Sequence, residues 1–206
     1  MPDKDMEEVV KKFQRQPEPD MCETAAMKCI LDVLAGRHGT TNIKLSLSKI
    51  NVHYSYRRGM GGDSELGISN LNDYLVKRGY RVQTRSGKGS TLELLKAIIE
   101  SEERSFPIIS VSPDYFEEQN RRYRATGECT WEHVLIVLGV NDEVEFFDPY
   151  EKFLLKSSNI SEVRNSLSKP KMLRYWERTS QLRWVVWIEK LSPRLEDFGD
   201  DLNGED

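Results

Sequence analysis

Apolar residues recur every three or four positions through the first hundred residues, and beyond them they alternate or run together. The helical period predicts helices at 4–14, 21–36, 68–79 and 92–100, with a shorter periodic piece at 43–52. The segment at 21–36 is apolar on all sides, which predicts a helix buried on most of its faces. Its Gly36 fits the position of a C-cap.

The second half of the chain has the pattern of strands. Apolar runs at 107–111, 133–140, 143–148 and 183–189 predict buried strands, and 80–84 alternates like a further strand. Between two of these runs, Asn141-Asp142 predicts a tight hairpin turn. Because most helices precede most strands and the hairpin is antiparallel, we expect an α+β fold with an antiparallel sheet.

Composition and charge narrow the domain organisation. The 206 residues suit one domain, and 38 % hydrophobic with 31 % charged residues is a globular composition. The net charge of -4 is uneven, because residues 194–206 hold six acids and one arginine and leave +1 to residues 1–193. We therefore predict a single domain over 1–193 and an acidic, disordered tail over 194–206. A body so near neutral gives no reason to expect nucleic acid as a partner.

The chain also lacks signals for export or membrane insertion. No apolar run approaches the roughly 18 residues of a membrane span, and the charged start at 1–13 does not resemble a secretory signal. Three cysteines without paired spacing argue against a disulfide framework. We therefore expect a cytoplasmic protein with no membrane partner, and leave its oligomeric state open.

Cys22 stands at the start of the most apolar predicted helix. Unpaired N–H groups and the helix dipole stabilise a thiolate at such a position, which suits a nucleophile. The alternative is a small packing residue on an Ala-rich helix. Cys29, seven residues further on and surrounded by apolar neighbours, has the pattern of a packing residue.

His133 opens the most apolar predicted strand, and Asp148 closes the next one. Folding the hairpin about Asn141-Asp142 pairs position 133 with 149–150, so Asp148 falls beside His133. An aspartate there can orient and polarise an imidazole, as the third member of a catalytic triad does. The alternative is a histidine with a purely structural role.

Gln16 lies six residues before Cys22, with two prolines between them. If the chain folds back across them, the Gln16 amide and the Cys22 backbone N–H can form an oxyanion hole. The alternative is an ordinary surface glutamine.

In this chain order, the four residues resemble those of papain-like cysteine peptidases, in particular stand-alone relatives of the bacteriocin-leader-processing (double-glycine) branch. The matching stretches are 16–22 with the helix after it, 77–80, 107–111 and HVLIVLGVNDEVEFFDPY at 133–150. The stretch from His133 to Asp148-Pro149 is the most specific of them, and residues 151–206 lie outside the resemblance. One departure is Glu23, where the family usually has glycine.

The resemblance implies a papain-like fold, with the helix of Cys22 packed on the sheet that carries His133 and a cleft between them. It implies Cys22 as nucleophile, His133 as general base and acid, Asp148 as orienting residue and Gln16 as oxyanion donor. It further implies a peptide or protein substrate and no cofactor or metal. Leader-processing members are typically fused to a membrane transporter, and the sequence shows no transporter segment. We therefore do not expect leader cleavage coupled to export.

The segment at 112–132 precedes His133 and holds three arginines at 121–124. It is either a solvated loop with a local helix or a lid or substrate-binding loop whose arginines meet acidic residues of a substrate. Cys22, Cys29, Cys129 and His133 lack the close spacing of a zinc site. The prediction is thus a cysteine peptidase, with deamidase or isopeptidase chemistry left open. A catalytically silent peptide-binding module is the first alternative, and a nucleic-acid-associated protein that uses its arginines is the second.

Overall fold

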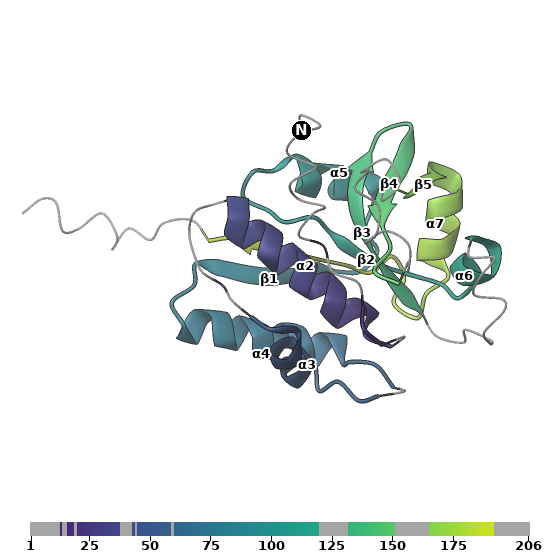
Figure 1. The fold of residues 1–206 in the computed structure, drawn as a ribbon. Helices are drawn as coiled ribbons and strands as arrows, with labels where there is room; N and C mark the ends of the chain where they lie inside the picture. Colours follow the sequence, from purple (N-terminus) through teal and green to yellow (C-terminus); the bar gives the residue numbers. More distant parts are fainter. Residues whose placement is uncertain are drawn as a thin grey trace, which may run out of the picture.

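The computed structural model describes residues 13, 16–18, 20–37, 43, 45–58, 60–119, 132–150 and 165–191. Within them, helices lie on both faces of one six-stranded sheet (Figure 1). The helices are α2 (Cys22–Arg37), α3 (Leu47–His53), α4 (Ser64–Lys77), α5 (Leu92–Glu100), α6 (Asp114–Gln119) and α7 (Lys169–Glu177). The strands are β1 (Val82–Gly87), β2 (Ile108–Val111), β3 (His133–Val140), β4 (Glu143–Phe147), β5 (Asn165–Ser168) and β6 (Val185–Lys190). The expected α+β class is confirmed.

The sheet is antiparallel throughout, in the order β1-β6-β2-β3-β4-β5. The β3–β4 hairpin turns at Asn141 and Asp142, as predicted. Its register pairs Ile136 with Phe147, and an irregularity follows between Val137 and Gly139. When this pairing is extended by three residues toward the start of β3, His133 lies opposite Tyr150, just past the end of β4.

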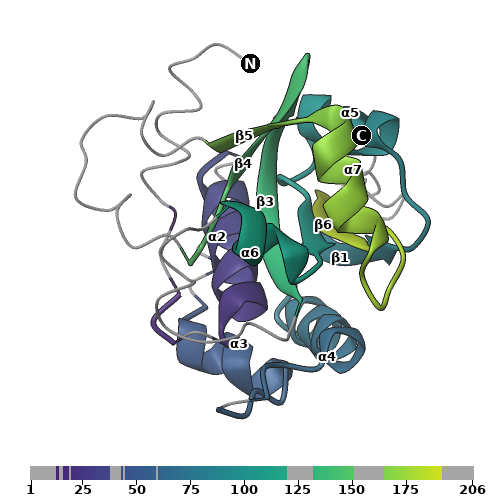
Figure 2. The ribbon, with the colours of Figure 1, turned by 90° about the vertical axis from the view of Figure 1, so that its right-hand side faces the viewer.

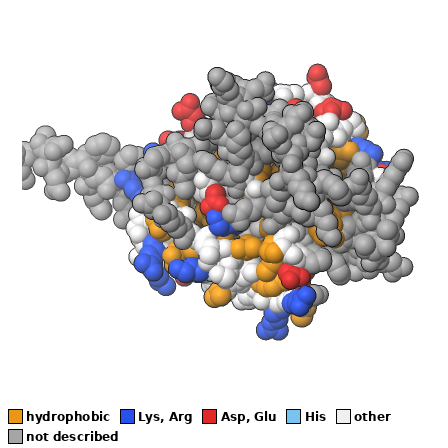
Figure 3. Space-filling model, viewed as in Figure 1, with side chains coloured by type: hydrophobic (Ala, Val, Ile, Leu, Met, Phe, Trp, Pro, Cys, Tyr) orange, Lys and Arg blue, Asp and Glu red, His pale blue; other side chains and the backbone are white. Residues whose placement is uncertain are grey.

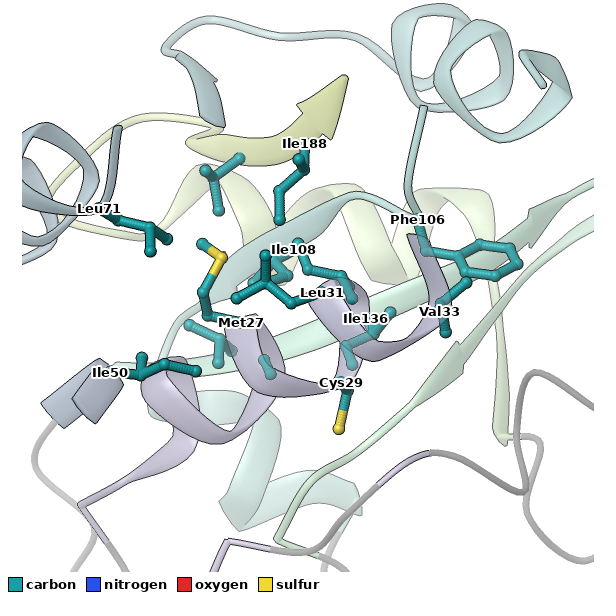
Figure 4. Packing of buried hydrophobic residues seen from close by; sticks show 14 of the residues in the cluster. Met27, Cys29, Leu31, Val33, Ile50, Leu71, Phe106, Ile108, Ile136 and Ile188 are labelled. Atoms are coloured by element: carbon teal, nitrogen blue, oxygen red, sulfur yellow. The ribbon is translucent and has the colours of Figure 1, made fainter. Parts of the chain in front are cut away.

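One face of the sheet is covered by α2 and, at β1, by α4, and α3 packs against both helices (Figure 1). Figure 4 shows Met27 and Leu31 of α2 next to Ile108, Ile136 and Ile188 of three neighbouring strands, and all five are fully buried. The expected buried helix on an antiparallel sheet is therefore present. Its Ala, Met and Leu side chains allow the helix to lie close to the strands.

The opposite face is covered by α5, α6 and α7 (Figure 2). Successive residues of the central strand alternate between the two cores, with Val134, Ile136 and Leu138 on the α2 side and Leu135 and Val137 on the other. A sheet buried on both faces explains why the strand sequences are continuous apolar runs instead of polar–apolar alternations.

Several element boundaries differ from the sequence-based expectations. The α4 helix begins at Ser64, four residues early, because Asp63 caps it by accepting from the Leu66 backbone N–H. The Gly36 C-cap was wrong, since α2 continues through Gly36 to Arg37. The strand expected at 80–84 runs over Val82–Gly87.

The elements β5 and α7 were missed altogether. Three other expectations, the helix at 4–14, the arginine-rich part of the 112–132 insert and the acidic tail at 194–206, fall outside the described residues apart from the buried Phe13. No helix among the described residues is long and apolar enough to cross a membrane.

Candidate active site

Cys22 is the first residue of α2 and is partly buried. The chain that leads to it is held against the end of β4, because the Gln16 backbone N–H donates to the Pro149 carbonyl at 3.0 Å. The Ala25 N–H donates to Met21, which closes the first turn of the helix. The thiol is therefore brought by a helix N-terminus to the sheet edge where β3 begins and β4 ends.

His133 and Asp148 form a buried pair at that edge. The His133 Nε2 donates to Asp148 Oδ1 at 2.7 Å, and the two residues are 1 % and 0 % exposed. Tyr115 Oη donates to the other oxygen, Oδ2, at 2.9 Å, and the Tyr150 backbone N–H donates to Oδ1 at 2.8 Å. Both carboxylate oxygens thus have partners, which fixes the Asp148 side chain and with it the plane of the imidazole.

The electrostatics of the pair keep the imidazole protonated. Burial lowers the pKa of His133, but the charge of Asp148, its hydrogen bond and a hydrogen bond with Cys22 outweigh this and raise the pKa to about 10. Since Nε2 faces Asp148, Nδ1 is the nitrogen left for Cys22. Hydrogen bonding thus links Cys22, His133 and Asp148 in that order.

Aromatic rings surround the imidazole on the side of the sheet that α5, α6 and α7 cover. Phe116 lies 4.6 Å from it between ring centroids, and Tyr115 and Tyr150 lie at 6.2 and 6.3 Å. Tyr115 is stacked on the imidazole, with an angle of 15° between the rings. These rings restrict the imidazole to one orientation and exclude water from the His133–Asp148 hydrogen bond.

Cys22 lines a pocket of about 440 Å³ on the α2 face of the sheet. Its walls come from the start of α2, the loop around Met60, the edge of β2 and β3, and the turn before β6. The lining residues are Asp20, Cys22, Glu23, Met60, Gly61, Gly62, Ser64, Ser110, Glu132, Val134, Ser180, Gln181 and Trp184. A thiol in the wall of an open pocket can be reached by a ligand.

Glu23, the departure from the family pattern, also lines this pocket. Ser64 Oγ donates to its Oε2 at 2.6 Å, whereas its Oε1 is buried and has no hydrogen-bond partner among the described residues. Burial raises the pKa of Glu23 to about 7, against the lowering effect of the Ser64 hydrogen bond, and nearby Asp63 adds to the rise. The residue beside the thiol is therefore a carboxyl that changes charge near neutral pH.

Gln16 is 8 % exposed and lies close to the site, but its side chain is engaged differently from the expectation. Its Nε2 donates to the Glu18 carbonyl at 2.9 Å. Donation to an oxyanion would use the second hydrogen of the same amide. The structure thus brings Gln16 to the Pro149 corner, and its oxyanion role stays a prediction.

The other two cysteines do not contribute to the described site. Cys29 is fully buried in the α2 core, as the packing interpretation predicts, while Cys129 is outside the described residues. Sequence reasoning missed Tyr115, because only the tertiary fold brings it to Asp148. In the described part of the chain, no group of three or more His, Cys, Asp or Glu residues is arranged to hold a metal ion.

Comparison with known protein families and with curated proteins finds no match for this chain.

Proposed function

We propose that this protein is a papain-like cysteine peptidase of the cytoplasm, with Cys22 as nucleophile, His133 as general base and acid, and Asp148 as orienting residue. The observation that carries the proposal is the hydrogen-bonded succession of Cys22, His133 and Asp148 at a pocket. These residues come from a helix N-terminus, the start of one strand and the end of the next.

The arrangement supports acyl transfer through a thioester. The Cys22 Sγ attacks the carbonyl carbon of a peptide bond, and the thiol proton resides on His133. The carbon–nitrogen bond then breaks as the His133 imidazolium gives its proton to the leaving amine. Water, activated by the now neutral His133, hydrolyses the thioester and returns a carboxylic acid and the free thiol. Asp148 holds the imidazole in place throughout.

The developing negative charge on the carbonyl oxygen needs donors. The backbone N–H of Cys22, at the unpaired start of α2, and the second amide hydrogen of Gln16 are our candidates. A peptide or protein segment is the substrate that this chemistry serves.

The decisive experiment measures alkylation of Cys22 by iodoacetamide between pH 5 and 9, with each cysteine followed by peptide mass spectrometry. We expect Cys22 in the wild type to react well below the pH of about 8.5 at which a free thiol ionises. We expect the His133→Ala variant to lose this advantage. Cys29, on the same helix but buried, is the internal control and is expected to react only upon unfolding.

If Cys22 reacts like a free thiol in both proteins, the peptidase proposal fails. That outcome favours the alternative of a catalytically silent peptide-binding module. One observation favours this alternative, because His133 is only 1 % exposed and a leaving amine must reach it. A cleavage screen with a proteome-derived peptide library, with Cys22→Ala as the control, then separates a peptidase from a binding module.

A further inference from the structure

The pocket in front of Cys22 carries charge of one sign. Asp20, Glu23 and Glu132 contribute three carboxyl groups to its lining, and the other lining residues are uncharged. The acids come from the turn before α2, the first turn of α2 and the residue just before β3. Two segments, residues 20–23 and the residue before β3, thus place carboxyl groups in the lining of one concavity beside the proposed nucleophile.

Three arginines close in sequence to pocket-lining residues pair with acids that lie outside the pocket. Arg58 pairs with Glu18 at 3.4 Å, and Arg178 pairs with Asp114 at 2.8 Å. Arg183 forms an ion pair with Glu177. On the face drawn in Figure 3, the Lys and Arg side chains are scattered along the edge formed by α3 and α4, with hydrophobic side chains between them.

A second observation points to a missing donor. Of the three acids, Asp20 accepts from Tyr56 Oη at 2.7 Å, and Glu132 accepts from Ser110 Oγ at 2.9 Å and from the Ser180 N–H. The Oε1 of Glu23, in contrast, is buried without a hydrogen-bond partner among the described residues. A carboxyl with an unsatisfied buried oxygen is costly to ionise, and a cation bound in the adjoining pocket lowers this cost through its charge.

We infer that this pocket binds a basic side chain of the substrate, a lysine or an arginine, close to the bond that Cys22 attacks. The inference rests on the proposed peptidase function. Val134 and Trp184 give the pocket an apolar wall for the aliphatic stem, while the acids face the ammonium or guanidinium group. A metal ion does not suit the site, since the described acids form no metal-binding group.

The inference differs from the expectation that arginines of the 112–132 insert meet an acidic substrate. The arginines at 121–124 lie outside the described residues, and the described lining of the pocket has the opposite sign. The charge of the pocket around Cys22 can be measured directly, without a known substrate.

The first measurement uses two thiosulfonate reagents of opposite charge. Cys22 attacks the sulfenyl sulfur, a mixed disulfide forms and methanesulfinate leaves. We compare trimethylammonium-ethyl and sulfonatoethyl methanethiosulfonate at pH 8 and follow Cys22 by peptide mapping. A change in thiol reactivity moves both rates together, so the ratio of the two rates isolates the charge of the pocket.

We expect the cation-to-anion ratio at Cys22 to exceed that of a free cysteine peptide by about tenfold or more, and to fall as salt is added. Glu23→Gln and Asp20→Asn should each reduce the ratio several-fold. Glu100→Gln, which removes an exposed acid from α5 on the other side of the sheet, is the matched control and should leave it unchanged. A ratio equal to that of the free peptide means that the chain neutralises its own pocket, and overturns the inference.

The second measurement tests the substrate class. Tripeptide acyloxymethyl ketones carry lysine, norleucine or glutamate at the first or the second position from the reactive carbon. We expect a lysine probe to label Cys22 faster than its norleucine counterpart, and Glu23→Gln to narrow the difference. Equal labelling by lysine and norleucine at both positions overturns the inference.

Failure of the proposed function has a different signature. The His133→Ala variant should slow both thiosulfonates, and because it also removes the imidazolium charge beside Cys22, it should raise the cation-to-anion ratio and not lower it. If His133→Ala changes neither rate, the proposed peptidase function fails, whatever the ratio shows. Failure of the inference therefore appears in the ratio of the two rates in the wild type, and failure of the proposed function appears in the effect of His133→Ala on the rates themselves.

Discussion

Two groups of buried polar atoms flank Cys22, and they are built in opposite ways. Around Asp148, three donors meet two acceptor oxygens, and each oxygen has a partner. Around Glu23, the carboxyl Oε1 and the Tyr54 hydroxyl are both buried without a hydrogen-bond partner among the described residues. Burial and the nearby charge of Glu23 raise the pKa of Tyr54 well above its usual value.

The difference means that the atoms around Asp148 keep one fixed arrangement, whereas those around Glu23 respond to protons and ligands. A satisfied buried network is rigid, because any movement breaks several hydrogen bonds at once. An unsatisfied one gains free energy from a proton or a ligand that supplies a donor. We therefore assign positioning of the imidazole to the Asp148 group, and response to pH and to substrate charge to the Glu23 group.

The largest effect is expected from Asp148→Ala. The change leaves three buried donors without an acceptor, and it removes the charge that stabilises the His133 imidazolium. We expect the free energy of unfolding to fall by about 3–5 kcal/mol, measured by urea denaturation at pH 7. Asp73→Ala, an exposed acid on α4, is the matched control and should change it by less than about 0.5 kcal/mol. A loss equal to that of the control would contradict the positioning role.

The next effect concerns pH. Because folding raises the pKa of Glu23 from 4.5 to about 7, the folded protein binds the proton more tightly than the unfolded chain. The stabilisation is complete below pH 4.5 and is lost as the pH rises through about 7, a change of about 3 kcal/mol. Glu23→Gln should remove this share of the pH dependence between pH 5 and 8.

His133 acts with the same sign over a higher range. Its raised pKa gives stability that is complete below pH 6.5 and is lost as the pH rises through about 10. Comparing the wild type with Glu23→Gln cancels this contribution, so urea midpoints at pH 5 and pH 8 isolate Glu23. Parallel pH curves for the two proteins would show that Glu23 titrates normally.

The smallest effect compares two tyrosines. Tyr115→Phe removes the donor to Asp148 Oδ2, so we expect a loss of about 2 kcal/mol. Tyr54→Phe removes a hydroxyl that is buried without a partner among the described residues, so we expect stability within about 0.5 kcal/mol of the wild type or above it. Thermal denaturation of both variants gives the comparison. Equal losses would mean that the two hydroxyls are equally well bonded.

Local signals predicted most of the fold. The α5 helix was predicted with its observed bounds, and β3 and β4 with theirs to within one residue, because each has a strong period and a clear end signal. The α7 helix was missed because Lys169-Pro170-Lys171 is polar and helix-breaking in appearance. Its buried residues Met172, Tyr175 and Trp176 do have helical spacing, and that signal was available.

The candidate site divides in the same way. His133 and Asp148 were paired from the sequence, because a short hairpin fixes the register of residues 15 positions apart. Glu23 was noticed as a departure, but its burial and its contact with Ser64, 41 positions away, were not predictable. Glu132 and Tyr115 had no local signal that tied them to Cys22.

The sequence by itself determined the place of Cys22 at the start of a helix, the hairpin pair and the helix that packs on the sheet. Periodicity, a two-residue turn and the start of a helix are properties of neighbouring residues. Only the tertiary structure decided that Tyr115 completes the Asp148 group and that Glu132 joins Asp20 and Glu23 at the pocket of Cys22. Those contacts join segments whose approach depends on the packing of the whole sheet, and no local pattern encodes it.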